Sequence, residues 1–285
     1  MEQTILSPKS DFIFKLIFGD ERNIDILKSF LQAVLDIPPE EYESITIVDP
    51  HLKREDGLDK LSILDVKIHT RSGYVIDVEI QLVDVPNMRE RIALYTAKMV
   101  TEQIAKGDEY GVLKRVISIV ITDYALLPEE EPYHNVYRWL NTKTHREFTD
   151  LIELNTLELP KLPQQADKSE LWDWMRFLKC EKQEEFEMIA AKNPQIEKAV
   201  GILMDLSADE RTRLLEESHQ KALWDYNSRM KGAFDKGEAK GEARGVRQGA
   251  KQREFEIARN ALRDGFPADA IQRITGLSRE EIGRL

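Results

Sequence analysis

The stretch that most constrains the fold is Ile-Asp-Val-Glu-Ile-Gln-Leu, residues 76–82, in which apolar and polar side chains alternate strictly. A β-strand places successive side chains on opposite faces of its sheet, so the alternation predicts a strand with one apolar and one polar face. The polar face carries Asp77, Glu79 and Gln81. Either this face only meets water, or its side chains bind something.

The neighbouring patterns predict a mixed α/β fold. Runs rich in β-formers alternate with segments in which apolar residues recur at helical spacing. The expected strands cover residues 44–48, 61–70, 74–83 and 112–122. The expected helices cover residues 8–18, 23–35 and 87–106. The resulting order is helix, three strands, helix, strand, and the second and third strands form a hairpin.

The rest of the chain predicts further strands and then helices. Residues 133–160 predict one or two strands around a turn at 141–145, and Leu162–Pro163 marks a boundary. Helical spacing follows to about residue 230, and the aromatic residues at its start are expected in the core. The expected divisions are a mixed α/β domain, a helical region, a Gly/Lys/Glu-rich linker or helix, and a small helical tail. They cover residues 1–163, 164–231, 232–252 and 253–285.

Two features of the C-terminal region leave alternatives open. Glycine recurs about every fourth residue in 232–252, and each glycine costs a helix about 1 kcal/mol relative to alanine. The segment is therefore either a solvated linker or a helix whose glycine face packs between two chains. In the tail, Pro267 and Gly276 bracket a short helix, and Ser278 with Glu281 matches a capping box. Such a tail is typical of a helix-turn-helix or of a dimerisation cap.

Composition limits the classes of protein. The 285 residues are 41% hydrophobic and carry a net charge of −11, which argues against nonspecific coating of nucleic acid by the whole surface. Residues 228–263 contain ten Lys or Arg and five Asp or Glu, so a polyanion is expected near this segment.

No apolar run reaches the roughly 20 residues of a membrane-spanning helix and no signal peptide is evident, so we expect a cytoplasmic protein without a membrane partner. Cys180 is the one cysteine in the sequence, so an intrachain disulfide is not possible.

The hairpin predicts a pair of opposed carboxylates. If its turn is centred on Ser72, residues whose numbers sum to 144 lie opposite each other, so Lys67 faces Asp77 and Asp65 faces Glu79. Like charges directly opposite destabilise a strand pair by up to about 1 kcal/mol unless something neutralises them. A divalent cation would do so, and oxygen ligands suit Mg²⁺ or Mn²⁺. The alternative is an exposed acidic patch whose carboxylates spread into water.

The motifs in this part of the sequence are similar to those of a known protein superfamily. Asp65 followed by Glu79-Ile80-Gln81 after a hairpin, in an αβββαβ order, resembles the core of the PD-(D/E)XK nuclease superfamily. Four short motifs are similar to the Rpn group of recombination-promoting nucleases and transposases. They are Asp-Phe-Ile-Phe-Lys at 11–15, Ile-Leu-Asp-Val at 63–66, Val-Glu-Ile-Gln at 78–81 and the segment 91–95. The resemblance covers about residues 7–160, and Thr-Gly-Leu-Ser at 275–278 is also similar to that group.

The resemblance implies a metal-dependent DNA endonuclease. Asp65 and Glu79 would hold Mg²⁺ or Mn²⁺, and the carbonyl of Ile80 would add a ligand. Gln81 stands where the superfamily usually has lysine, so this position keeps a hydrogen-bond donor but loses a positive charge. Lys67, one strand step from Asp65 on the same face, is a candidate to supply the missing charge.

Residues of two helices complete the implied site. Asp11 is the expected third acidic residue, with Glu21 as a rival, although Asp11 could instead form an i,i+4 salt bridge with Lys15. Arg91 and Tyr95 lie one turn apart on the helix after the hairpin and are expected, with Lys15, to contact phosphate. Tyr95 could instead belong to the core.

Two hypotheses for function follow. The first is a magnesium-dependent endodeoxyribonuclease connected with DNA recombination or mobile elements, acting as a homodimer because cutting both strands generally takes two sites. The second is a catalytically inactive, nuclease-like module that binds DNA or a protein partner. No phosphate-binding glycine loop or serine-hydrolase elbow is present in the sequence, so no nucleotide cofactor is expected.

Overall fold

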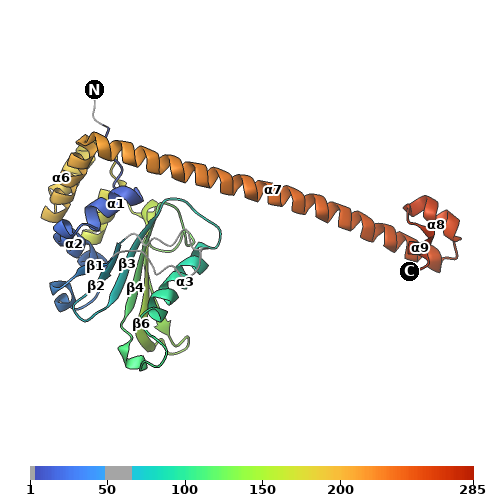
Figure 1. Ribbon diagram of the computed structural model, residues 1–285, viewed down its shortest axis with the longest axis horizontal. Coiled ribbons are helices and arrows are strands. Elements are labelled where there is room, and N and C mark those ends of the chain that lie inside the picture. The colour runs from blue at the N-terminus through green and yellow to red at the C-terminus, as the bar shows by residue number, and fades with distance from the viewer. Residues whose placement is uncertain (1–3, 49–65) are drawn as a thin grey trace. The chain divides into compact units, whose positions relative to one another are not determined.

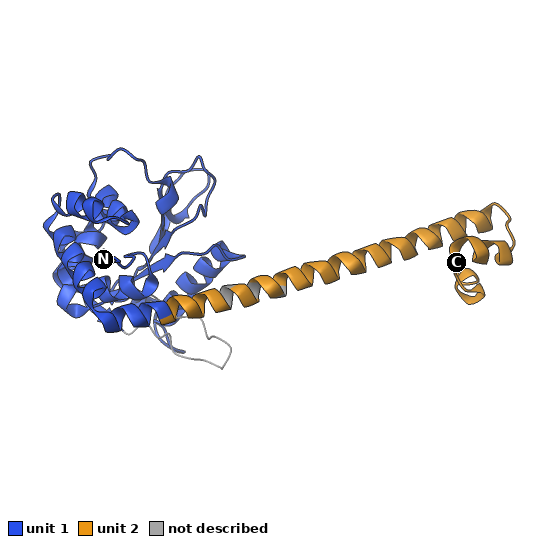
Figure 2. Cartoon of the chain, turned by 90° about the horizontal axis from the view of Figure 1, so that it is seen from above, with its two compact units in different colours: residues 1–217 blue, residues 218–285 orange. Residues whose placement is uncertain are grey.

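The computed structural model describes residues 4–48 and 66–285. The chain divides into two compact units, Met1–Glu217 and Ser218–Leu285, which are coloured separately in Figure 2. The first unit contains the β-sheet with its covering helices, and the described part of the second unit is helical.

The first unit is built on a mixed sheet (Figure 1), which within the described residues has six strands in the order β1-β2-β3-β4-β6-β5. The strands are β1 (Thr46–Val48), β2 (Val66–His69), β3 (Val75–Gln81), β4 (Val116–Thr122), β5 (His134–Leu140) and β6 (Glu147–Glu158). β4 runs parallel to both of its neighbours, β3 and β6, whereas the other strand pairs are antiparallel. The predicted mixed α/β class is confirmed, and the region from 133 to 160 forms two strands.

Helices connect and cover the strands. The α-helices of this unit are α1 (Asp11–Phe18), α2 (Ile24–Val34), α3 (Met88–Thr101), α4 (Glu170–Lys179), α5 (Gln183–Ala190), α6 (Pro194–Ala208) and the beginning of α7 (Glu210–Arg263). Short 3₁₀ turns are η1 (Glu21–Asn23), η2 (Pro39–Glu43), η3 (Tyr110–Val112) and η4 (Leu159–Lys161). The expected order of helix, three strands, helix and strand is therefore present.

The sheet is covered on both faces (Figure 1). The apolar face of the hairpin, with Ile76 and Val78, belongs to one large core that also contains the buried faces of α1, α2, α4, α5 and α6. Trp174 of α4 packs edge-on against Phe18 and Phe30 with ring centres 5.6 and 6.0 Å apart, which confirms that the aromatic residues after the boundary are core. α3 covers the opposite face, where its apolar side chains pack on β4.

The hairpin has the predicted register wherever it is described. Val66 lies opposite Val78, Lys67 opposite Asp77 and Ile68 opposite Ile76, so each pair sums to 144. Glu41 of η2 stabilises the turn of the hairpin. Its Oε2 accepts hydrogen bonds from Thr70 Oγ1 at 2.5 Å and from the Ser72 amide at 3.1 Å. Gly73 has a φ of +86°, a left-handed value that favours glycine. Asp65 lies outside the described residues.

Two helix ends differ from the expected ones. α1 begins at Asp11 rather than at Pro8, because residues 7–10 form a turn in which the Ser10 amide bonds the Ser7 carbonyl at 3.1 Å. α3 ends at Thr101 rather than near Lys106. Gln103 explains this end, since its side chain bonds the Met99 carbonyl and both backbone groups of Lys114, which ties the helix to the chain leading into β4.

The second unit continues α7 and adds α8 (Ala268–Thr275) and α9 (Arg279–Ile282). Ala258, Ile271, Leu277 and Ile282 form its small core. The predicted caps are confirmed: Gly276 is left-handed with a φ of +74°, and Ser278 and Glu281 form the capping box. Residues 232–252, left open as linker or helix, are helical within α7. No helix in the described part of the chain has the length and apolar character needed to cross a membrane.

Candidate active site

Glu79 lies in the middle of the sheet. It is the fifth residue of β3, beside Val120 of β4, and only 4% of its surface is exposed. Asp77, two positions earlier on the same face, is buried as well. The polar face of β3 is therefore enclosed under α3 rather than turned to water. A buried carboxylate without compensating charge or hydrogen bonds is costly, so the surroundings of Glu79 decide what it can do.

Two donors converge on one oxygen of Glu79. Gln81, the next residue on the same face of β3, donates its side-chain amide to Glu79 Oε1. Arg91 of α3 reaches the same oxygen from the covering helix, with Nη2 at 3.4 Å. The Arg91 guanidinium also lies 5.3 Å from the ring centre of Tyr95, which is one turn further along α3. The Tyr95 side chain is partly buried. Glu79, Gln81, Arg91 and Tyr95, all selected from the sequence, are thus brought together.

Burial raises the pKa of Glu79, and the positive charges of Arg91 and Lys15 oppose this rise without cancelling it. Lys15 comes from α1, so the electrostatics of this carboxyl group involve a helix from each side of the sheet. A carboxyl group in this state favours its proton more than an ordinary glutamic acid does. An additional cation at the site would favour the ionised form.

Glu79 fits the role of one metal ligand. Its carboxylate is a hard oxygen donor of the kind that Mg²⁺ and Mn²⁺ take. The second predicted ligand, Asp65, lies outside the described residues. Among residues 4–48 and 66–285, no group of three or more His, Cys, Asp or Glu side chains could hold a metal ion by itself. The two-carboxylate site therefore stays a prediction that rests on Glu79 and on the register of the hairpin.

The remaining predicted residues lie around this centre. Lys67 stands opposite Asp77 in β2, and its Nζ lies 3.3 Å from Oε2 of Glu102, just after α3. Asp11 is the first residue of α1, where its Oδ1 accepts the Phe12 amide at 2.8 Å, and its rival Glu21 is an exposed residue of η1. The catalytic roles of these residues stay predictions.

Tyr124 belongs to the same neighbourhood and was not selected from the sequence. Burial raises its pKa to about 12, and the carboxyl groups of Asp84 and Glu79 add to the rise. Its hydroxyl group is buried, and so is Arg91 Nε; neither atom has a hydrogen-bond partner within the described ranges. Buried polar atoms of this kind are rare in folded proteins, and a bound water or ion, local strain or a functional role accounts for them. The signal that could have found Tyr124 is its place just after β4, since parallel strands end at a common edge.

The loop that carries Tyr124 is fixed by a buried carboxylate. Glu158, at the end of β6, accepts the backbone amides of Leu126 at 2.9 Å and Leu127 at 3.3 Å. Lys161 neutralises Glu158 with an ion pair of 3.1 Å. At the beginning of the loop, Thr122 Oγ1 donates to the Tyr124 carbonyl at 2.8 Å. The position of the Tyr124 ring is thus set by both ends of its loop.

Comparison with protein families shows to which family the chain belongs. Residues 8–233 match the family described as PD-(D/E)XK nuclease family transposase. The chain belongs to this family. Residues 251–285 match the C-terminal helix-turn-helix domain of the Rpn/YhgA-like nuclease family. Comparisons with curated proteins and with solved structures gave no significant match.

The family assignment confirms two predictions and sharpens a third. The PD-(D/E)XK fold and the Rpn group are both as the sequence motifs indicated. For the tail, the alternatives were a helix-turn-helix and a dimerisation cap, and the match favours the helix-turn-helix. A PD-(D/E)XK nuclease family assignment indicates a nuclease-like function and divalent metal as the usual cofactor of the family, and the helix-turn-helix indicates DNA as a partner.

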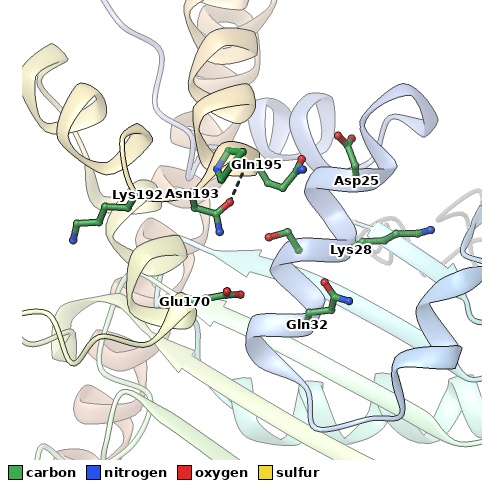
Figure 3. Close-up of a pocket in the computed structure, with 9 residues that line it drawn as sticks. Asp25, Lys28, Gln32, Glu170, Lys192, Asn193 and Gln195 are labelled. Carbon is green, nitrogen blue, oxygen red and sulfur yellow. Dashed lines mark hydrogen bonds between the residues drawn. The ribbon is translucent and has the colours of Figure 1, made fainter.

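The first unit also has a surface depression that lies away from Glu79. It has a volume of about 400 Å³ and lies between α2 and the beginning of α6 (Figure 3). Its lining mixes both signs of charge, with Lys28 and Lys192 beside Asp25 and Glu170, so it selects neither anions nor cations. Asn193 at its edge caps α6, where its Oδ1 accepts the Gln195 amide at 2.8 Å. None of the residues around Glu79 lines it.

Proposed function

We propose that the chain is a divalent-metal-dependent DNA endonuclease that hydrolyses phosphodiester bonds at the site around Glu79. The observation that carries the proposal is the burial of Glu79 with Gln81 and Arg91 on one of its oxygens, in a chain of PD-(D/E)XK type. Asp65 is the proposed second metal ligand, with the Ile80 carbonyl as a third. When bound, Mg²⁺ or Mn²⁺ supplies a water molecule of lowered pKa and offsets the charge that builds on the phosphate.

The protein's own groups then have separate tasks. Gln81 orients the Glu79 carboxylate through its amide, which replaces the hydrogen bond but not the charge of the usual lysine. Arg91 is about one-third exposed, so its guanidinium can turn from Glu79 to a phosphate of the substrate once a metal neutralises Glu79. Before that movement, the ring of Tyr95 supports the guanidinium of Arg91. Lys15 supplies positive charge to the same site.

The partners follow from the same proposal. DNA is the substrate, and the helix-turn-helix unit adds affinity for it. A homodimer provides two sites for two strands, and the glycine face of α7 is the proposed contact between the chains. Connection with DNA recombination and a cytoplasmic location belong to this proposal as well.

The test of the proposal is cleavage of supercoiled plasmid by the purified full-length chain. We expect nicked or linear plasmid with Mg²⁺ or Mn²⁺, and no product with EDTA. Protein in which Glu79 is replaced by Gln, purified in parallel, controls for contaminating nucleases. If every metal gives intact plasmid while a gel shift still shows a complex, the alternative of an inactive, nuclease-like DNA-binding module is correct.

Replacing Tyr124 by Phe tests whether the buried hydroxyl group serves the substrate. We expect plasmid cleavage to fall about 10- to 150-fold, because a hydrogen bond to a charged phosphate contributes about 1.5–3 kcal/mol. The melting temperature should stay equal or rise, because the hydroxyl group has no partner among the described residues. Unchanged cleavage, or a clear loss of thermal stability, would assign the hydroxyl group a structural role.

A further inference from the structure

The first unit has a groove beside α4 and α5 that is separate from the site around Glu79. It is lined from one side of α4, from α5 and from the chain after η4, by Trp172, Arg176, Lys179, Met188, Ile189 and Leu162. Its volume is about 490 Å³, which is within the range of pockets that bind small molecules. We call this space the α4–α5 groove.

Part of the lining is apolar. Met188, Ile189 and Leu162 supply aliphatic side chains, and the buried side chain of Trp172 lines the groove with them. The indole N–H of Trp172 donates to the Pro163 carbonyl at 2.9 Å. Because this polar atom already has its partner, the ring offers the groove an apolar surface.

The other part of the lining carries hydrogen-bond donors. Arg176 and Lys179 follow Trp172 by about one and two turns on the same side of α4, so Lys179 lies about 10 Å from Trp172 along the helix. Within the described ranges, Arg176 donates one hydrogen bond, to Glu185 Oε1 at 2.7 Å, and Lys179 Nζ donates to the Leu159 carbonyl at 2.9 Å. A guanidinium has five N–H groups and an ammonium has three. Both cations therefore retain donors for a further acceptor.

The charges of the groove do not cancel. Among the described residues, three cations and one carboxylate line it: Arg176, Lys179, Lys192 and Glu185. Arg176 is ion-paired with Glu185 at 2.7 Å, and Lys192 with Asp173 of α4 at 3.2 Å. Lys179 has no carboxylate partner in the described part of the chain, where its ammonium group bonds a backbone carbonyl instead. The groove therefore has a surplus of one positive charge, located at Lys179.

The surroundings of Lys179 leave this surplus in place. Burial lowers the pKa of Lys179, and the positive charge of Arg176 lowers it further. Asp123 opposes this change, but it is ion-paired at 2.7 Å with Lys9, whose charge lowers the pKa of Lys179 as well. The other glutamates of α5 are exposed and do not line the groove. An anion beside Lys179 would favour its charged form.

The lining selects the kind of ligand. A surplus of one positive charge matches a monoanion better than a phosphate monoester, which carries about −1.5 to −2 charges at pH 7. The forked N–H groups of Arg176 match the planar shape of a carboxylate. We propose that the α4–α5 groove binds a small carboxylic acid with an apolar body, whose carboxylate lies at Arg176 and Lys179 and whose body lies against Trp172. Binding of such a ligand does not depend on the proposed nuclease activity.

A matched pair of ligands tests the proposal. Naphthalene-1-acetate is an apolar carboxylate that the groove can hold, and naphthalene-1-acetamide has the same shape without the charge. In a ligand-detected NMR titration of the full-length chain, we expect the acid to bind with a Kd of about 1 mM or lower, as is usual for a ligand of this size. The amide should bind about tenfold more weakly or worse, because it loses a charge-assisted hydrogen bond. Equal affinities, or no binding of the acid at about 10 mM, would overturn the proposal.

Charge changes at Met188 show whether the groove is the binding site. Met188 is 65% exposed, so its replacement should leave the fold intact. Met188→Glu should weaken binding of the acid about two- to fivefold, and Met188→Lys should strengthen it by a similar factor, while the amide is unaffected. Leu94→Glu is the matched control for net charge, because Leu94 is 55% exposed on α3, which covers the opposite face of the sheet. An affinity that responds equally to Met188→Glu and Leu94→Glu, or to neither, would place binding elsewhere.

Replacing Lys179 by Met tests the assigned charge. Met keeps much of the aliphatic chain and removes the ammonium group, so the preference for the acid over the amide should fall about threefold or more. The preference is a ratio of two affinities on the same sample, so a partly unfolded sample does not change it. A folded variant that keeps the full preference would overturn the role of Lys179. If the variant does not fold, the two Met188 variants still decide the proposal.

Discussion

Replacing Glu79 by Gln is expected to abolish metal-dependent cleavage while raising the melting temperature at neutral pH. The loss of cleavage should exceed about 100-fold, because even residues that only orient metal ligands contribute about 10- to 100-fold. Gln keeps the shape of the side chain but removes the charged oxygen that would hold a cation. The same change would leave the amide of Gln81 and the guanidinium of Arg91 close to a neutral group.

The gain in stability follows from the direction of the pKa shift. Burial raises the pKa of Glu79 in the folded state above its ordinary value of 4.5, despite Arg91 and Lys15. The stability that this group contributes is fully present below the unfolded pKa, and it is lost as pH rises through the folded pKa. Above the ordinary pKa this contribution declines, and Gln, which does not titrate, avoids the decline. The site keeps a group that function needs at a cost in stability.

Thermal melts of both proteins across a range of pH check this expectation. The variant should melt higher than the wild type at neutral pH, and the difference should shrink as pH falls through the raised folded pKa and vanish below the ordinary pKa of 4.5. Glu43→Gln is a suitable control, because Glu43 pairs with Arg71 at the exposed surface and should show almost no effect. A variant that melts lower at neutral pH would mean that Arg91 already stabilises an ionised Glu79. A variant that cleaves like the wild type would place catalysis elsewhere.

The sequence was most informative where side chains follow a strict period. Alternation with a period of two fixed which residues of β3 share a face, and the turn around Ser72 fixed the register with β2. A slip by one residue would have placed Ile76 and Val78 on the polar face, so the pattern allowed one answer. The caps at Gly276 and Ser278 were predictable for a similar reason, because each depends on a local backbone geometry.

Contacts between elements could not be derived in this way. The approach of Arg91 to Glu79 depends on how α3 crosses the sheet, which no local pattern contains. Tyr124 follows β4 as an isolated aromatic residue, and only the parallel arrangement of β3 and β4 brings it near the site. The pairing of β5 with β6 shifts in register on both sides of Trp139, which no sequence pattern indicated.

Helix propensity gave an incomplete answer for residues 232–252. Glycines at a spacing of about four residues weaken a helix by about 1 kcal/mol each, which favoured a solvated linker over a helix. The segment is nevertheless part of α7, whose 54 residues contain many charged and good helix-forming side chains between the glycines. Apart from the neighbouring residues and backbone of the helix itself, no atom in the described ranges lies within 4 Å of where a Cβ would stand on these glycines. This open face is what the proposed contact between two chains would use.

Replacing Glu153 by Ala is expected to cause the largest loss of stability in the first unit. Glu153 is 2% exposed in β6, where its Oε2 lies 2.5 Å from Arg115 Nη2 and 2.6 Å from Arg138 Nε. Asn155 donates to its other oxygen at 3.0 Å. Removing one member of a buried ion pair costs about 3–5 kcal/mol, because the partner charge stays buried without compensation. Arg115, the less exposed of the two, should account for most of this loss, since solvent screens part of the charge of Arg138.

The measurement is a comparison of melting curves and urea unfolding for Glu153→Ala and Glu43→Ala. The first variant should melt about 10 °C lower, and the second, which loses only an exposed pair, should stay within about 0.5 kcal/mol of the wild type. Burial opposes the ionisation of Glu153, but hydrogen bonds from Asn155 and Arg138 and the charge of Arg115 outweigh it and hold its pKa below the usual value. The stability from Glu153 is therefore present above pH 4.5 and lost as pH falls through the lower folded pKa. If the two variants unfold alike at neutral pH, the two arginines find solvent or other partners and the buried charges contribute little.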